Sequence, residues 1–354
     1  ATDRRSVSYF SMGSNSYAPN GVKVIKIGIN GTDWLDPQSV KLFFDVQNKQ
    51  GSTSNMSVKT SHAWAFFRRM RVTCGGVILE DIDNYARLHT MMHMMKTSHD
   101  RDENDNTEGF GDGETLANGK SRTCCFTPLS GILYQKKYLP IRYCPLFFEF
   151  ELVGNVAEAV SGSTAFELSN VQLKCDLVTL DNNASNSYDQ HLLDGGNLPI
   201  NFCTYTTGSQ LIQDIRADIN VQRTFTRMKA VYVSLSTNST ANGRTGKEVD
   251  SFYHPMTSSS GDYDFGKEME FGIQIGNHRF PEYPIRSVAE FSTQLRKLLS
   301  KYGTQYTDAM DITASQYRNN KFVIGIDTEK MPASFTGYNS KAGDVLTMSF
   351  KKNG

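Results

Sequence analysis

The fold is decided near the middle of the chain by residues 170–208, which read NVQLKCDLVTLDNNASNSYDQHLLDGGNLPINFCTYTTG. Apolar and polar residues alternate with a period of two over residues 171–178, and this pattern predicts a half-buried strand. The apolar positions of that strand are Val171, Leu173, Cys175 and Leu177. After a polar break and a short helical segment, a second strand is predicted at residues 200–206. We therefore expect this stretch to join two β domains.

The helical segment between these strands has its own end signals. Ser185 and Asn186 are alternative N-cap residues, because a short polar side chain can accept a hydrogen bond from a free backbone N–H group. Gly195-Gly196 is the stop signal, because glycine readily adopts the left-handed conformation that often follows the last helical turn. The segment is therefore predicted to be a short capped helix.

The connector divides the chain into halves of similar length. Residues 21–177 are predicted to form the first domain and residues 197–354 the second, with the linker and its helix at 178–196. Residues 1–20 are rich in serine and asparagine without sustained periodicity, so we expect an N-terminal arm that contact with a neighbouring molecule orders. A strand that closes the second domain is expected beyond residue 354.

Short apolar stretches separated by turn signals occur in both halves, which is typical of an all-β sandwich or barrel. Strands are expected in the first half at residues 24–29, 40–46, 63–72, 77–79, 124–127, 132–134, 143–152 and 171–178. Strands are expected in the second half at residues 200–206, 228–235, 269–275, 322–326 and 346–350. Gly75-Gly76 suits a tight hairpin turn, because both positions of such a turn need positive φ.

Each half also contains one amphipathic helix, which shows as apolar residues at helical spacing. In the first half these residues are Ile82, Tyr85, Leu88, Met92 and Met95. In the second half they are Ile285, Val288, Phe291, Leu295, Leu298, Leu299 and Tyr302, with Gly303 as the stop. Both halves thus run through strands, one helix and further strands, so the sequence predicts two domains of similar plan.

The charges of the chain are balanced. Among 354 residues, 37 are basic and 37 acidic, so the formal net charge is zero. We expect no direct sequence-specific binding of nucleic acid, because phosphate binding needs a surplus of basic residues. No apolar run reaches the length of a membrane span and the N-terminus lacks a signal pattern, so we expect no transmembrane segment and assembly inside a cell.

The six cysteines give no metal or disulfide pattern. They are Cys74, Cys124, Cys125, Cys144, Cys175 and Cys203. None belongs to a C-x-x-C motif or a Cys/His cluster at zinc spacing. Most fall at apolar strand positions, which favours buried free thiols in a reducing compartment. A bridge from Cys124 or Cys125 to another part of the chain stays open.

Each candidate catalytic or metal site lacks residues that its motif requires. Residues 100–106, DRDENDN, begin like a calcium loop, but Asp105 stands where glycine is needed and Gly111 where glutamate is needed. His89 and His93 have the i, i+4 spacing of a zinc pair without a third ligand. No nucleophile motif is present. We therefore predict no catalytic residues, no metal site, no cofactor and no enzyme activity.

Two long polar loops, at residues 97–122 and 236–268, are the unusual feature of the sequence. Loops this long in a compact domain are usually functional. Their aromatic residues are the candidate contact residues, namely Phe110, Phe252, Tyr253, Tyr263 and Phe265. A clasp between subunits and a receptor- or glycan-binding surface are both open interpretations. The clasp is favoured, because aromatic side chains among adaptable polar ones suit a protein interface.

Two segments resemble the same protein family. The run QLKCDLVTLDNN…YDQHLL…LPINF, within residues 172–202, resembles the segment between the two domains of double jelly-roll major capsid proteins. The run RRMRVTCGGVILEDIDNYARLHTMM, residues 68–92, resembles a hairpin and helix of the first jelly roll in that family. The family belongs to polinton-like viruses, virophages and related double-stranded DNA viruses of the adenovirus lineage.

The resemblance implies an all-β double jelly roll: two eight-stranded sandwiches with one inserted helix each and long loops. It also implies a structural major capsid protein whose homotrimers form pseudo-hexameric, hexon-like capsomers of an icosahedral virion. Its partners would be further copies of itself and then penton and minor capsid proteins. A carbohydrate- or receptor-binding β-sandwich module is the alternative function, and a cupin-type enzyme is a distant third.

Overall fold

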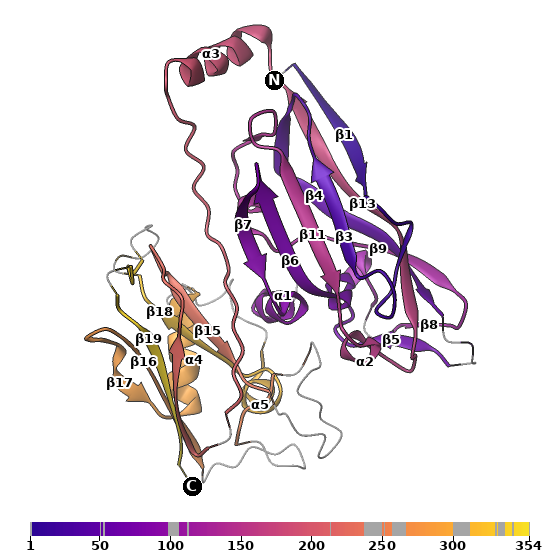
Figure 1. Cartoon of the computed structure of the whole chain (residues 1–354). Helices are drawn as coiled ribbons and strands as arrows, with labels where there is room; N and C mark the ends of the chain where they lie inside the picture. Colours follow the sequence, from indigo (N-terminus) through magenta and orange to yellow (C-terminus); the bar gives the residue numbers. More distant parts are fainter. Residues whose placement is uncertain are drawn as a thin grey trace. The chain divides into compact units, whose positions relative to one another are not determined.

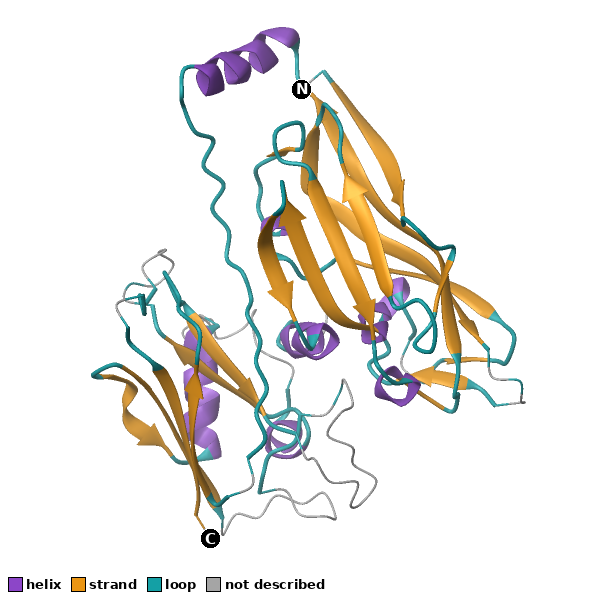
Figure 2. Cartoon of the chain, viewed as in Figure 1, coloured by secondary structure: helices purple, strands orange, loops and turns teal. Residues whose placement is uncertain are grey.

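The computed structural model describes residues 2–49, 51, 54–97, 106–111, 113–212, 214–236, 250, 252–256, 267–299, 312–329, 331, 337–341 and 343–353 (Figures 1 and 2). The chain divides into two compact units. The first unit consists of Ala1–Thr90 and His99–Thr207, and the second of Met91–Ser98 and Gly208–Gly354. The connector therefore belongs to the first unit as far as Thr207.

One sheet of the first unit is built around β13 (Phe166–Thr179), the strand with the strongest alternation in the sequence. The strand order is β1 (Asp3–Phe10), β13, β4 (Trp34–Asn48) and β10 (Leu139–Pro140), with β2 (Ser16–Tyr17) also paired to β13 and β9 (Ser121–Phe126) to β4. The predicted apolar face of β13 is confirmed, because its four residues Val171, Leu173, Cys175 and Leu177 are all buried.

A second sheet packs on the first and completes the sandwich. Its order is β3 (Val24–Ile29), β11 (Leu146–Leu152), β6 (Phe67–Cys74) and β7 (Val77–Ile82). The Phe44 ring on β4 meets the Phe67 ring on β6 edge to face, with 5.5 Å between the centroids. The inner faces of the two sheets thus form one core. A small third sheet of this unit contains β12 (Val160–Ser161), β5 (Met56–Val58) and β8 (Thr115–Leu116).

Short helices connect the strands that surround this core. They are η1 (Ala63–Phe66), α1 (Tyr85–Met94), η3 (Asn106–Glu108), η4 (Gly131–Leu133) and α2 (Val156–Ala159). The β6–β7 hairpin turn is confirmed, since Gly75 and Gly76 have φ angles of 55° and 84°. The predicted strand at 132–134 is wrong. Its N–H groups turn back locally to the carbonyls of Ser130 and Gly131, which makes η4 instead of a ladder.

The connector helix is α3 (Asn182–Leu193). Its N-cap is Asp181, whose carboxylate accepts a hydrogen bond from the Ala184 N–H at 2.7 Å. The predicted caps, Ser185 and Asn186, are therefore wrong, because the helix begins one turn earlier. Gly195 follows the helix with a φ of 81°, as the stop signal predicted.

In its described residues the second unit contains one four-stranded and one two-stranded sheet. The first has the order β14 (Arg216–Val221), β19 (Leu346–Asn353), β16 (Glu268–Ile275) and β17 (His278–Ile285), and the second pairs β15 (Ala230–Ser234) with β18 (Val323–Asp327). Its helices are α4 (Val288–Leu298) and α5 (Ala314–Asn319). A Cβ on Gly325 would lie 2.6 Å from a Leu295 methyl group, so α4 packs directly on β18. The predicted stop of this helix, Gly303, lies outside the described residues.

The N-terminal segment is not an arm over residues 3–10. These residues form β1, which pairs with β13 in antiparallel register from Asp3 opposite Thr179 to Phe10 opposite Gln172. Only Val7 and Tyr9 of this strand are even half-buried, because β1 lies at the edge of the sheet. An edge strand of this kind leaves no clear apolar period in the sequence.

Two cysteines that were expected to be free thiols form a disulfide between Cys74 and Cys144. Cys74 ends β6 and lies opposite Leu146, the first residue of β11, so the sheet register brings Cys144 beside it. The Cα atoms are 5.8 Å apart, which suits a disulfide. Cys124 and Cys175 are free and buried as expected, whereas the free Cys203 is exposed.

Three further segments differ from the predictions. The strands β14 and β17 were not predicted. In β14 exposed and half-buried residues alternate, and in β17 most residues are exposed, so neither strand has a buried apolar face along its length. The strand predicted at 200–206 is wrong: these residues join no sheet. Among the described residues, no helix is both long and apolar enough to cross a membrane.

Candidate functional site

The clearest surface feature of the first unit is the outer face of the sheet formed by β3, β11, β6 and β7. Alternate residues of each strand point into the core, so the residues between them share the opposite face. Two rows of side chains cross this outer sheet face. We name them the apolar row (Met12, Gly28, Phe147, Thr73 and Ile78) and the charge row (Lys26, Glu149, Arg71, Asp81 and Arg69).

The apolar row spans all four strands. Phe147 lies opposite Gly28 on one side and Thr73 on the other, and Thr73 lies opposite Ile78. A Cβ on Gly28 would lie 2.8 Å from the Phe147 ring and 3.0 Å from the Met12 methyl group, so the glycine makes room for both. Met12, Phe147 and Ile78 are 52%, 43% and 54% exposed. Large apolar side chains that are exposed side by side mark a contact surface.

The charge row runs beside the apolar row as a ladder of ion pairs. Lys26 Nζ lies 3.6 Å from Glu149 Oε2, and Arg71 Nη1 lies 3.7 Å from Glu149 Oε1. Arg71 Nη2 also lies 3.4 Å from Asp81 Oδ2. Arg69 binds the same carboxylate with two nitrogens, Nε at 2.8 Å from Oδ1 and Nη2 at 2.7 Å from Oδ2. Each charge in the row therefore has an opposite charge beside it.

The ion pair between Arg69 and Asp81 shifts the pKa values of both partners. The hydrogen bonds from Arg69 lower the pKa of Asp81 below its ordinary value of 3.8, and Asp81 raises the pKa of Arg69. Ion pairs at a surface contribute only about 0–1 kcal/mol each to stability. The row has three basic and two acidic side chains, so most of its charge is neutralised by pairing within the row.

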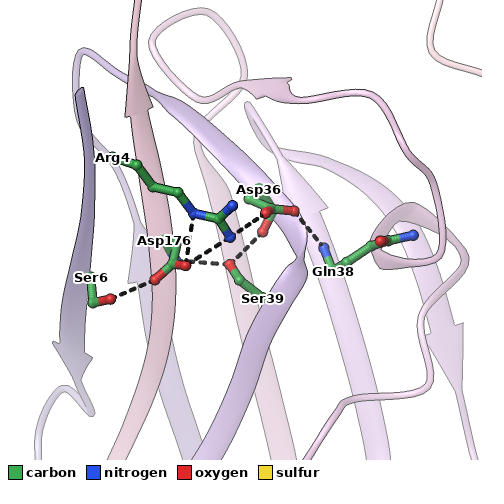
Figure 3. A network of polar contacts seen from close by, with 6 residues as sticks. All are labelled: Arg4, Ser6, Asp36, Gln38, Ser39 and Asp176. Carbon is green, nitrogen blue, oxygen red and sulfur yellow. Dashed lines mark hydrogen bonds and ion pairs between the residues drawn. The ribbon is translucent and has the colours of Figure 1, made fainter. Parts of the chain in front are cut away.

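A second polar network fastens the N-terminal strand (Figure 3). From β1, Arg4 reaches across to two carboxylates, with Nη2 at 2.7 Å from Asp36 Oδ2 and Nε at 3.0 Å from Asp176 Oδ2. The Ser6 hydroxyl donates to Asp176 Oδ1 at 2.6 Å. The Ser39 hydroxyl donates to the Asp36 carbonyl at 2.7 Å and accepts from the Asp176 N–H at 2.8 Å. The network therefore links β1, β13 and β4.

Of the five predicted contact residues, the structure describes Phe110, Phe252 and Tyr253. Phe110 and Phe252 are each 1% exposed, so both rings are buried within the chain. The Arg122 guanidinium lies 5.2 Å from the centre of the Phe110 ring. Tyr253 is half-buried, and Tyr263 and Phe265 lie outside the described residues. A contact role for these loop aromatics stays a prediction.

The helical histidines are packing residues. The Trp64 ring is stacked between two imidazoles, with centroids at 4.2 Å from His62 and 4.0 Å from His89. His89 and His93 are both buried. Among the described residues, no three His, Cys, Asp or Glu side chains are grouped as metal ligands.

Sequence analysis missed both polar networks. The period-two pairs of charges in β6 and β11 did indicate an outward face, since Arg69 and Arg71 alternate with buried residues, as do Glu149 and Glu151. What the sequence lacked was the register that puts β3, β11, β6 and β7 side by side. For the N-terminal network, the only signal was the charged residue Arg4 in a segment without clear strand periodicity.

The sequence matches no protein-family model and no curated protein. Solved structures do match. PBCV-1 VP54, as fitted into a reconstruction of the virophage Sputnik, is 14% identical with a TM-score of 0.64, and the match covers 99% of this chain and 84% of that one. The PBCV-1 capsid model is 12% identical with a TM-score of 0.63 over the same shares, 99% and 84%. The Faustovirus major capsid protein is 8% identical with a TM-score of 0.57, and the match covers 99% and 90%.

These matches extend over both units of the chain. At such low identity they establish the fold and nothing further. The resemblance noted in the sequence is thus confirmed at the level of the fold. The chain is an all-β protein with a double jelly-roll fold similar to that of these capsid proteins.

Proposed function

We propose that the chain is a structural major capsid protein of an icosahedral double-stranded DNA virus, and that its place is the virion. The observation that carries the proposal is the likeness of 99% of the chain, both units included, to capsid proteins at TM-scores of 0.64, 0.63 and 0.57. The role is a structural one without catalysis. It depends on the shape of the subunit and on the surfaces that meet other subunits.

Three copies around a three-fold axis would present six jelly rolls, which makes a block with nearly hexagonal outline that can tile a shell. The apolar row is the surface that we assign to contact with a second copy of the chain. Charge supports this occupant, because the charge row is internally paired and the chain has no net charge. Two copies can therefore approach without long-range repulsion.

Capsomer-to-capsomer contacts and contacts with penton and minor capsid proteins would follow at the next level of assembly. They would use other surfaces, because the apolar row is covered within the trimer. The long loops, with Tyr253, Tyr263 and Phe265, stay candidates for a clasp between subunits.

The direct test is the solution mass, measured by light scattering on a sizing column with negative-stain images of the same peak. Three chains of 39.6 kDa give about 119 kDa, and a particle of that mass with a hexagonal outline is expected. A monomer of 39.6 kDa that does not assemble at high concentration would contradict the proposal. That outcome would favour the carbohydrate- or receptor-binding module instead.

A variant tests the assigned surface. Phe147→Asp puts a charge into the apolar row at a side chain that is already 43% exposed, so it should weaken association more than folding. The matched control is Leu193→Asp on α3, where the side chain is 82% exposed outside the row. We expect F147D to be monomeric and folded and L193D to keep the mass of the wild type. If the two variants had equal solution masses, the apolar row would not take part in the contact between copies.

A further inference from the structure

Glu80, on β7, is a carboxylate that is buried in the first unit, with an exposed fraction of 2%. The groups that donate hydrogen bonds to it are all neutral. They are the Ser130 hydroxyl, the Gly131 N–H at 3.1 Å from each carboxylate oxygen, and the Tyr205 N–H. Burial raises the pKa of Glu80, and the hydrogen bonds only partly offset this effect. The site therefore retains an acidic group where an apolar side chain would cost less desolvation.

One of the donors to Glu80 comes from the connector. Tyr205 belongs to residues 196–207, the segment without helix or strand that follows α3 and its turn, and its backbone N–H donates to the Glu80 side chain. This explains why residues 200–206 join no sheet although they are extended. Their hydrogen-bond partner is a side chain on the edge strand β7 and not a neighbouring strand.

Two more contacts hold the connector at the same place. Gly131 lies so close to the Cys203 carbonyl that any Cβ at position 131 would overlap with it. The Thr207 hydroxyl donates to the Asp83 carbonyl at 2.6 Å. The contacts thus come from every second residue of an extended segment, 203, 205 and 207, so one side of the connector lies against the first unit.

We propose that Glu80 is a positioning residue that fastens residues 203–207 to the first jelly roll, so that the link to the second jelly roll begins only after Thr207. The link ends at Ile215, whose carbonyl accepts a hydrogen bond from the Lys352 N–H of β19 at 2.8 Å. The compact first unit also ends at Thr207, which agrees with this assignment. A link that begins after Thr207 allows far fewer arrangements than one that begins directly after α3. The inference rests on the fold and holds whether or not the chain forms trimers.

Hydrogen–deuterium exchange of the full chain, read by mass spectrometry, tests the proposal on Glu80→Gln. The amide keeps the volume but replaces one acceptor oxygen by an NH₂ group that cannot accept from Gly131 or Tyr205. A hydrogen bond to a charged group is worth about 1.5–3 kcal/mol. We therefore expect exchange in the peptide that contains Tyr205 to be faster by on the order of tenfold or more, while peptides from β4 and β13 exchange as in the wild type.

The matched control is Glu151→Gln, the same chemical change on the outer sheet face, which should leave connector exchange unaltered. Gly131→Ala is the second variant. It displaces the connector from the other side and keeps the Glu80 carboxylate, so it also covers the case in which E80Q does not fold. Connector exchange that stays at the wild-type rate in folded E80Q or in G131A overturns the proposal. The mass of the wild type, measured on the same sample, reports separately on the capsid function.

Discussion

Glu80 and Asp81 are neighbours on β7, yet they lie in opposite environments. Glu80 faces the inside of the unit, is 2% exposed and is bound by neutral donors, and burial raises its pKa. Asp81 faces outward, is bound by two nitrogens of Arg69, and has a lowered pKa. A strand turns successive side chains to opposite faces, so two adjacent acids acquire opposite electrostatics.

The difference shows which polar groups depend on the complete folded arrangement of the first unit. The Asp81 ion pairs can form in any arrangement that keeps the sheet register, and solvent can replace them in part. The Glu80 hydrogen bonds exist only when the β7 edge, the loop at Ser130 and the connector at Tyr205 are all in place. The buried site is therefore the more specific of the two, and removing it should be costlier.

The largest effect is expected for Glu80→Ala. The change leaves the Ser130, Gly131 and Tyr205 donors without an acceptor and opens a cavity, so the free energy of unfolding should fall by about 3 kcal/mol. Urea denaturation measures it. The control is Glu151→Ala, a change on the outer sheet face that should cost less than about 0.5 kcal/mol. Equal stability of E80A and E151A would contradict the larger contribution of the buried site.

Asp81→Asn should have a smaller effect. It removes the paired hydrogen bonds from Arg69 on a side chain that is 30% exposed, so solvent screening limits the loss to about 1 kcal/mol or less. The same denaturation experiment applies. A loss as large as that of E80A would mean that the outer sheet face, and not the buried site, stabilises β7.

A change of pH should alter the stability contributions of Glu80 and Asp81 in opposite directions. The folded protein holds the Glu80 proton more tightly than the unfolded chain does, so the wild type should gain stability relative to E80Q as the pH falls through the raised pKa towards the ordinary value of 4.5. The wild type should instead lose stability relative to Asp81→Asn as the pH falls below 3.8 through the lowered pKa of Asp81. Denaturation curves between about pH 7 and pH 3 measure both differences, which must change in opposite directions.

The smallest effect should come from salt. In 1 M salt the screening length is about 3 Å, so the cost of Asp81→Asn should shrink by a few tenths of a kcal/mol relative to low salt. The cost of Glu80→Ala should not change, because the partners of Glu80 are neutral and its carboxylate is buried. Equal salt dependence of the two variants would contradict the assignment of neutral partners to Glu80.

Much of the fold could be predicted because its signals are local. The alternation in β13, the Gly75-Gly76 turn and the apolar stripe of α4 each lie within a few residues of sequence. Edge strands were harder. Residues 3–10 bury too few side chains to show an apolar period. Residues 200–206 were predicted as a strand, and they resemble one in that every second residue contacts the first unit, as Thr207 does.

The sites depend on residues far apart in the sequence. The disulfide joins Cys74 to a residue 70 positions away, and no spacing rule selects Cys144 among the other cysteines. The Glu80 site combines residues 80, 130, 131 and 205, and only the folded register brings them together. Phe110 and Phe252 show the converse: aromatic rings in long polar loops are buried as part of the chain's own packing.

The most direct test of the account is a cryo-electron microscopy reconstruction of the purified protein. We predict a three-fold symmetric particle with two jelly rolls per chain, in which a neighbouring chain covers Met12, Phe147 and Ile78. A particle made of one chain would contradict the proposed function. So would a trimer in which the apolar row faces solvent or is covered by the second unit of the same chain, because the proposed contact between copies would then be absent.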